Sequence, residues 1–97
     1  MTEGLIKGAV KTILDGIKDA QMQYEYAEKA AEHGNHEAAM FHIEEAKRRL
    51  EGAKTWYDRG MKMHGDHVDP LADMMMDHYR AWYRDLHERI TNFKPGA

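Results

Sequence analysis

The chain contains no cysteine and no serine among its 97 residues, and it has only two prolines. The absence of cysteine excludes disulfides, thiolate metal sites and thiol nucleophiles, and it fits the reducing cytoplasm. The absence of serine excludes a serine nucleophile. No glycine-rich phosphate loop is present, and no apolar run approaches the roughly 20 residues that span a bilayer. The first residues also lack the pattern of a secretory signal, so we expect a cytoplasmic protein.

The chain also has no excess of basic residues. It contains 14 lysines and arginines and 17 aspartates and glutamates, which gives a net charge of −3. Binding to nucleic acid or to an anionic membrane therefore lacks its usual electrostatic driver, and we expect neither as a partner. Apolar residues make up 42% of the chain and charged residues 32%. This composition and length are typical of one folded domain, covering residues 1–97.

Glycine and proline mark two breaks in a sequence that otherwise favours helices. Gly34 suits the left-handed position that follows a helix, and Asn35 can cap the next helix. Asp69 is a good cap for a third helix, and Pro70 fits the first helical position because its missing N–H has no partner there. The sequence thus predicts three helices, over about residues 3–33, 36–64 and 70–92.

Small and large apolar residues recur at alternating steps of three and four in the first two predicted helices, which defines one face of each helix. The first stripe contains Ile13, Ile17, Ala20, Tyr24, Ala27 and Ala31. The second contains Ala39, Ile43, Ala46, Leu50, Ala53, Tyr57, Gly60 and His64. A tight turn makes the helices antiparallel, so facing residue numbers should sum to about 70 and bring small residues against large ones, as in Ala20 and Leu50. We predict an all-α fold, in which a long antiparallel helical hairpin and a third helix form an up-down-up bundle.

Further apolar residues lie on both flanks of the contact between these two stripes, which we call the seam. One flank carries Ala9, Gly16, Ala30, His42, Trp56 and Met63, where small residues beside Trp56 form a groove. The third helix has a stripe that could fill it: Leu71, Met75, His78, Trp82, Leu86, Ile90 and Phe93. The other flank carries Leu5, Leu14, Met40 and Met61, and we expect a second copy of the chain to cover it, giving a homodimer.

Carboxylates and histidines suggest a metal site as one alternative. Glu25 and Glu28 lie level with His42 and Glu45 across the hairpin, and bundles that bind two irons use such residues. Residues 19–53 resemble a ferritin-like hairpin, which implies a metal-binding bundle. Because the heptad positions put Glu28 and His42 on opposite flanks of the contact between the helices, we expect such a site for iron or copper to lie between protomers. A second group of possible copper ligands is rich in methionine and histidine: Met61, Met63, His64, His67, Met74, Met75, Met76 and His78.

A third alternative is an RNase. Arg59 and His64, followed by Val68-Asp69-Pro70 and a helix, resemble the catalytic motif of HEPN domains. This resemblance implies that Arg59 stabilises a phosphate and that His64 acts as the acid and base.

The leading interpretation comes from aromatic residues and arginines in the third helix. Tyrosine, tryptophan and arginine are enriched at the energetic centres of protein interfaces. The expected interaction surface consists of Tyr79, Arg80, Trp82, Tyr83 and Arg84. Since no complete catalytic motif is present, we expect a non-enzymatic helical-bundle protein that acts through self-association and binding to another protein.

Overall fold

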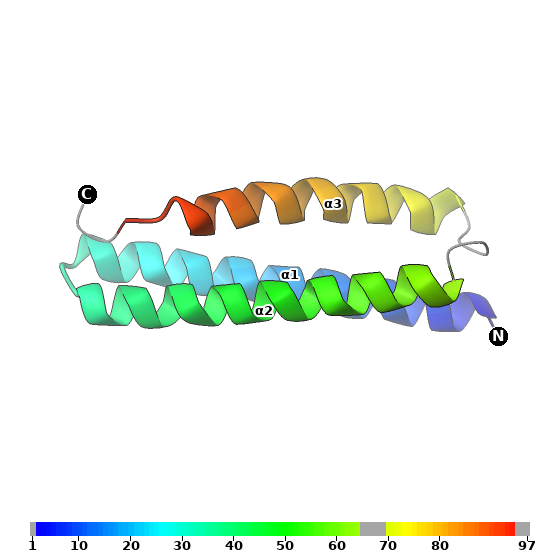
Figure 1. Ribbon diagram of the computed structural model, residues 1–97, viewed down its shortest axis with the longest axis horizontal. Helices are drawn as coiled ribbons and strands as arrows, with labels where there is room; N and C mark the ends of the chain where they lie inside the picture. Colours follow the sequence, from blue (N-terminus) through cyan, green and yellow to red (C-terminus); the bar gives the residue numbers. More distant parts are fainter. Residues whose placement is uncertain (1, 65–69, 95–97) are drawn as a thin grey trace.

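Three helices make up the computed structural model, which describes residues 2–64 and 70–94, with side chains for residues 10–59, 74 and 76–94. The helices are α1 (Thr2–Glu32), α2 (His36–His64) and α3 (Pro70–Thr91). As Figure 1 shows, α1 and α2 form an antiparallel hairpin, and α3 runs beside them in the direction of α1. The elongated bundle measures 50 × 18 × 17 Å. The predicted all-α, up-down-up architecture is therefore confirmed, and no strand occurs in the described residues.

The turn between α1 and α2 has the expected chemistry. Gly34 has a φ of +76°, a left-handed conformation that a residue with a Cβ adopts only at an energetic cost. The amide of Gly34 donates to the carbonyl of Ala31 at 3.0 Å, and that of Asn35 donates to Ala30 at 2.9 Å. The Asn35 side chain then accepts a hydrogen bond from the amide of Ala38 at 3.1 Å. One turn thus satisfies the polar groups at two helix ends.

The predicted seam between α1 and α2 is the core of the hairpin. Both stripes supply buried residues: Ile13, Ile17, Ala20, Ala27, Ala39, Ile43, Ala46, Leu50 and Ala53. The helices come so close at Gly16 that a Cβ there would lie 3.3 Å from the Ala53 Cβ. An ion pair at 3.7 Å joins Asp19 to Arg49. The residue numbers of these two pairs sum to 69 and 68, close to the expected register.

The flank on which α3 packs differs from the prediction. Trp56 is 51% exposed, so α3 does not cover it. Instead, the indole N–H of Trp82 donates to the Gln21 side chain at 2.6 Å, on the flank where Leu14 lies half-buried against the core. One physical reason is that Gly16, which the prediction placed on that flank, lies against Ala53 in the seam. Gly16 is therefore not available to form a groove for α3.

The face that α3 turns to the hairpin was also partly mispredicted. Met76 and Tyr79 are buried with Leu86 and Ile90, whereas His78 is exposed. The side chains of Leu71 and Met75 lie outside the described residues. The buried face is thus shifted by one residue in the first half of α3, because a stripe through Tyr79 buries more apolar area than one through His78.

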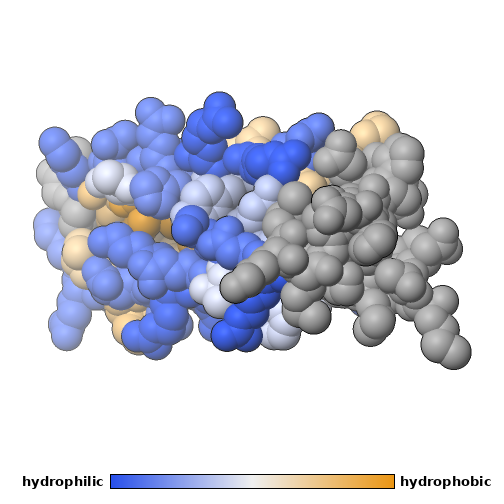
Figure 2. All heavy atoms as spheres, turned by 45° about the vertical axis from the view of Figure 1, so that its right-hand side comes forward, coloured by the Kyte–Doolittle hydropathy of each residue, from blue (hydrophilic) through white to orange (hydrophobic). Residues whose placement is uncertain are grey.

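Since α3 occupies the flank of Leu14, that flank is not free for a second copy of the chain, and the predicted dimer surface is wrong in this respect. Met40 is 43% exposed near the turn, and the side chains of Leu5 and Met61 lie outside the described residues. Figure 2 shows a mainly hydrophilic surface on the described part of one face. No helix in this part of the chain has the length and apolar character that a membrane span requires.

Two glycine substitutions test the turn and should act in opposite directions. We expect Gly34→Ala to lower the free energy of unfolding by about 1 kcal/mol, because Gly34 has a positive φ. Gly52→Ala should raise it by up to about 1 kcal/mol, since Gly52 is exposed within α2 and a Cβ there meets nothing within 4 Å. Urea titration followed by circular dichroism measures both. Equal effects of the same sign would contradict this account of the turn.

Candidate functional site

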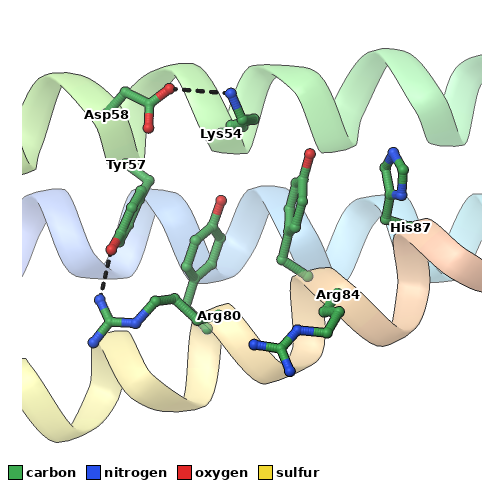
Figure 3. A pocket seen from close by; sticks show the side chains of 8 residues that line it. Lys54, Tyr57, Asp58, Arg80, Arg84 and His87 are labelled. Carbon is green, nitrogen blue, oxygen red and sulfur yellow. Dashed lines mark hydrogen bonds and ion pairs between the residues drawn. The ribbon is translucent and has the colours of Figure 1, made fainter.

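A cavity of about 330 Å³ lies between α2 and α3 and combines aromatic rings with charged groups. Its lining comes from Lys54, Tyr57 and Asp58 on α2 and from Tyr79, Arg80, Tyr83, Arg84 and His87 on α3. We call these eight residues the α2–α3 site. In Figure 3, Tyr57 points from α2 toward α3, and the ring of His87 points from α3 toward α2. The two helices therefore build the site together.

The aromatic rings of the α2–α3 site hold one another in place. Tyr57 stacks on Tyr79 with ring centres 4.7 Å apart. Tyr79 in turn lies 5.9 Å from Tyr83, whose ring stacks on His87 at 5.7 Å. The three α3 residues of this row, Tyr79, Tyr83 and His87, are spaced four apart in the sequence, so they lie one above the other on a single face of the helix. The result is a row of rings whose orientations are set before any ligand arrives.

The charged groups differ in how fully they are paired. Arg80 donates to the Tyr57 hydroxyl at 2.5 Å and forms an ion pair with Asp77. These hydrogen bonds, the one to Asp77 first, raise the pKa of Arg80. Lys54 lies 3.4 Å from Asp58. Arg84 is exposed and forms no ion pair with any residue that the structure describes, which leaves it free for a partner.

Tyr79 forms the floor of the site and is only 2% exposed. Burial raises the pKa of its hydroxyl well above the ordinary value, and the neighbouring Tyr83 and Asp58 add to this shift. The pKa of Tyr24, which packs against Phe93 at the far end of α3, is also raised, mainly by burial and then by Glu28. Both hydroxyls therefore stay neutral to a higher pH than that of an exposed tyrosine.

The structure brings most of the expected interaction surface together, with two corrections. Tyr79 lies in the core and supports the site from beneath. Trp82 turns toward α1, where it binds Gln21, and so does not line the cavity. Tyr83, Arg80 and Arg84 do line it. The sequence reasoning missed His87 and the α2 contribution, although the spacing of four from Tyr83 to His87 was a usable signal.

The four residues of the proposed metal site do not gather within one chain. Glu25 accepts a hydrogen bond from Gln21, Glu28 is exposed, and Glu45 pairs with Arg48 at 3.0 Å. His42 is bonded through Nδ1 to the Gln23 side chain at 2.8 Å. Among the residues with described side chains, no three histidine, aspartate or glutamate groups lie close enough to hold a metal ion. A site between protomers stays a prediction.

The other two candidates lie partly outside the described residues. Arg59 is exposed on α2, but the side chain of His64 is not described, so their geometry stays open. In the methionine- and histidine-rich stretch, Met74 is 68% exposed and Met76 is buried at 4%. These two methionines point into different environments, and the side chains of the stretch before Met74 are not described.

Comparisons with known proteins return no relative: no protein-family model matches the chain, and neither a curated protein nor a solved structure gives a match. The geometry of the site is therefore the basis for any functional proposal.

The raised pKa of Tyr79 predicts a loss of stability in alkali. A folded-state pKa above the unfolded value of about 10 stabilises the fold below pH 10, and this contribution is lost as the pH rises further. We expect Tyr79→Phe to reduce that loss, because the ring is kept and the titrating hydroxyl is removed.

Tyr26→Phe is the matched control, since Tyr26 is 43% exposed. The measurement is urea unfolding at several pH values between about 8 and 11. Identical pH profiles for wild type and Tyr79→Phe would contradict the assignment.

Proposed function

We propose that this chain is a non-enzymatic, cytoplasmic helical-bundle protein that acts by associating with itself and by binding another protein through the α2–α3 site. One observation carries the proposal: a row of neighbouring tyrosine rings, of which Tyr57 and Tyr79 are stacked, lies beside arginines at an open cavity of about 330 Å³. Tyrosine and arginine are the residue types that most often dominate the binding energy of protein interfaces.

Pre-positioning strengthens this interpretation. Tyr57 is fixed by its stack on Tyr79 and by the hydrogen bond from Arg80. The ring of Tyr83 is confined between Tyr79 and His87. Side chains that are already ordered lose little conformational entropy on binding, so more of their contact energy becomes affinity.

Self-association finds support on the flank of the hairpin that α3 leaves open. Phe41 is 60% exposed, and the His42 ring lies 5.3 Å from it and 5.5 Å from Tyr26. Trp56, further along the same side of α2, is 51% exposed. We define Tyr26, Phe41 and Trp56 as the open aromatic flank. Exposed aromatic groups on one side of a hairpin are typical of a surface that packs against another chain.

Site-specific photo-crosslinking tests the binding of another protein. We expect a photo-reactive amino acid in place of Asp58, an exposed lining residue, to give discrete adducts in the cells that make the protein. Tyr83→Ala should weaken these adducts, because it removes one ring of the row. The control position is Arg48, which is 76% exposed on α2 outside the cavity. Equal labelling at both positions, or none at position 58, would count against the proposal.

Size-exclusion chromatography with light scattering tests self-association separately. At about 50 µM we expect twice the mass of one chain for the wild type and a shift toward the monomer for Phe41→Ser with Trp56→Ser. Met74→Ser removes an equally exposed apolar side chain on α3 and should leave the mass unchanged. A wild-type monomer would refute self-association without affecting the α2–α3 site.

A further inference from the structure

A second cavity extends the α2–α3 site along the same two helices. This cavity of about 400 Å³ shares Lys54, Tyr83 and His87 with the first. It adds Leu50 and Lys47 from α2 and Ile90 from α3. Because the shared residues line both cavities, the two form one groove, which we call the α2–α3 groove.

The length of the groove matches a short helical segment. On α2 it runs from Lys47 to Asp58. At ~1.5 Å of rise per residue this is about 17 Å, which equals roughly three turns of a bound helix. Amphipathic helices of this length commonly bind in grooves of other helical proteins through apolar residues three and four apart.

The floor of the groove is apolar. Leu50, Tyr79 and Ile90 are each at most 4% exposed, and the half-buried rings of Tyr57 and Tyr83 stand beside them. Such a floor favours the apolar side chains of a ligand, since burying them removes more apolar surface from water.

The rim of the groove is positively charged, in contrast to the chain as a whole. Four cations line it, namely Lys47, Lys54, Arg80 and Arg84, against the two carboxylates of Glu51 and Asp58. The whole chain, in contrast, has a net charge of −3. Glu44 and Asp77, which pair with Lys47 and Arg80, lie outside the lining, so the excess of cations is confined to the groove itself, where it favours a ligand of negative charge.

The ion pairs that the rim cations already form leave these cations able to bind the carboxylates of a ligand. Lys47 lies 3.5 Å from Glu44, Lys54 lies 3.4 Å from Asp58, and Arg80 forms an ion pair with Asp77, all with exposed side chains. Exposed pairs of this kind hold their partners weakly. Arg84 has no ion-pair partner among the described residues and is the cation most available to a ligand carboxylate.

We infer that the α2–α3 groove binds an acidic amphipathic peptide segment of a partner protein. The apolar face of the segment packs on Leu50, Tyr83 and Ile90, and its carboxylates bind Arg84 and the other rim cations. The inference rests on the proposed function and adds the chemistry of the partner. A nucleic acid fits less well, because its phosphate backbone has no apolar face to pack on the apolar floor of the groove.

Fluorescence anisotropy with the full chain tests this inference. The probe is a fluorescein-labelled synthetic helix of about 12 residues, with leucine and tryptophan on one face and glutamate on the other. We expect it to bind, and we expect the affinity to fall as salt is raised from about 50 to 500 mM. Arg84→Glu should weaken binding about tenfold or more, because it reverses the free cation of the rim.

Arg48→Glu is the matched control: it makes the same charge change at an exposed α2 position outside both cavities, and it should change the affinity less than about twofold. Circular dichroism checks that both variants keep their helices. The same peptide with lysine in place of glutamate, and a labelled oligothymidylate, should not bind.

Three results would overturn the inference: no binding of the acidic peptide, tighter binding of the lysine peptide or the oligothymidylate, or equal effects of the two arginine variants. If the lysine peptide binds and Tyr83→Ala abolishes that binding, the groove remains a protein-binding site for a different class of segment. The crosslinking experiment at position 58, which keeps Arg84, tests the proposed function independently of all peptide results.

Discussion

The close packing of α1 against α2 is the constraint on which the rest of the structure depends. Ile17, Ala20 and Ala46 are fully buried in this seam, and Gly16 approaches Ala53 so closely that a Cβ at position 16 would lie only 3.3 Å from the Ala53 Cβ. Small residues allow the two backbones to come together, and large residues opposite them fill the remaining space. Everything that α3 contacts is presented by this hairpin.

The third helix adds polar and aromatic contacts to the apolar packing that also holds the seam. Its buried residues belong to the same apolar cluster as those of the seam: Met76, Tyr79, Leu86 and Ile90. In addition, Tyr79 stacks on Tyr57, and Trp82 donates to Gln21. The α3 backbone approaches the hairpin less closely along its length than α1 and α2 approach each other, and the cavities of the α2–α3 groove lie between α2 and α3.

The hairpin could be predicted from the sequence because it depends on local signals. Gly34 and Asn35 define the turn, and the alternating spacing defines both stripes. The position of α3 could not be derived in this way, because both flanks carry apolar residues and pattern alone does not rank them. Whether Gly16 could make room for α3 depended on how closely α1 approaches α2 at that residue. A sequence pattern does not give this distance between the two helices. For the same reason, the sequence could not predict that Tyr57 accepts a hydrogen bond from Arg80 on α3, or that Lys54 lines a cavity with α3.

The placement of α3 on only one flank has a consequence for valency. The open aromatic flank and the α2–α3 groove lie on different sides of the hairpin, so occupancy of one leaves the other accessible. Two chains joined through the aromatic flanks would carry a pair of outward-facing grooves on one rigid body. A partner that displays its segment twice would then bind with a gain in avidity set by the spacing of the grooves, even where each single contact is weak.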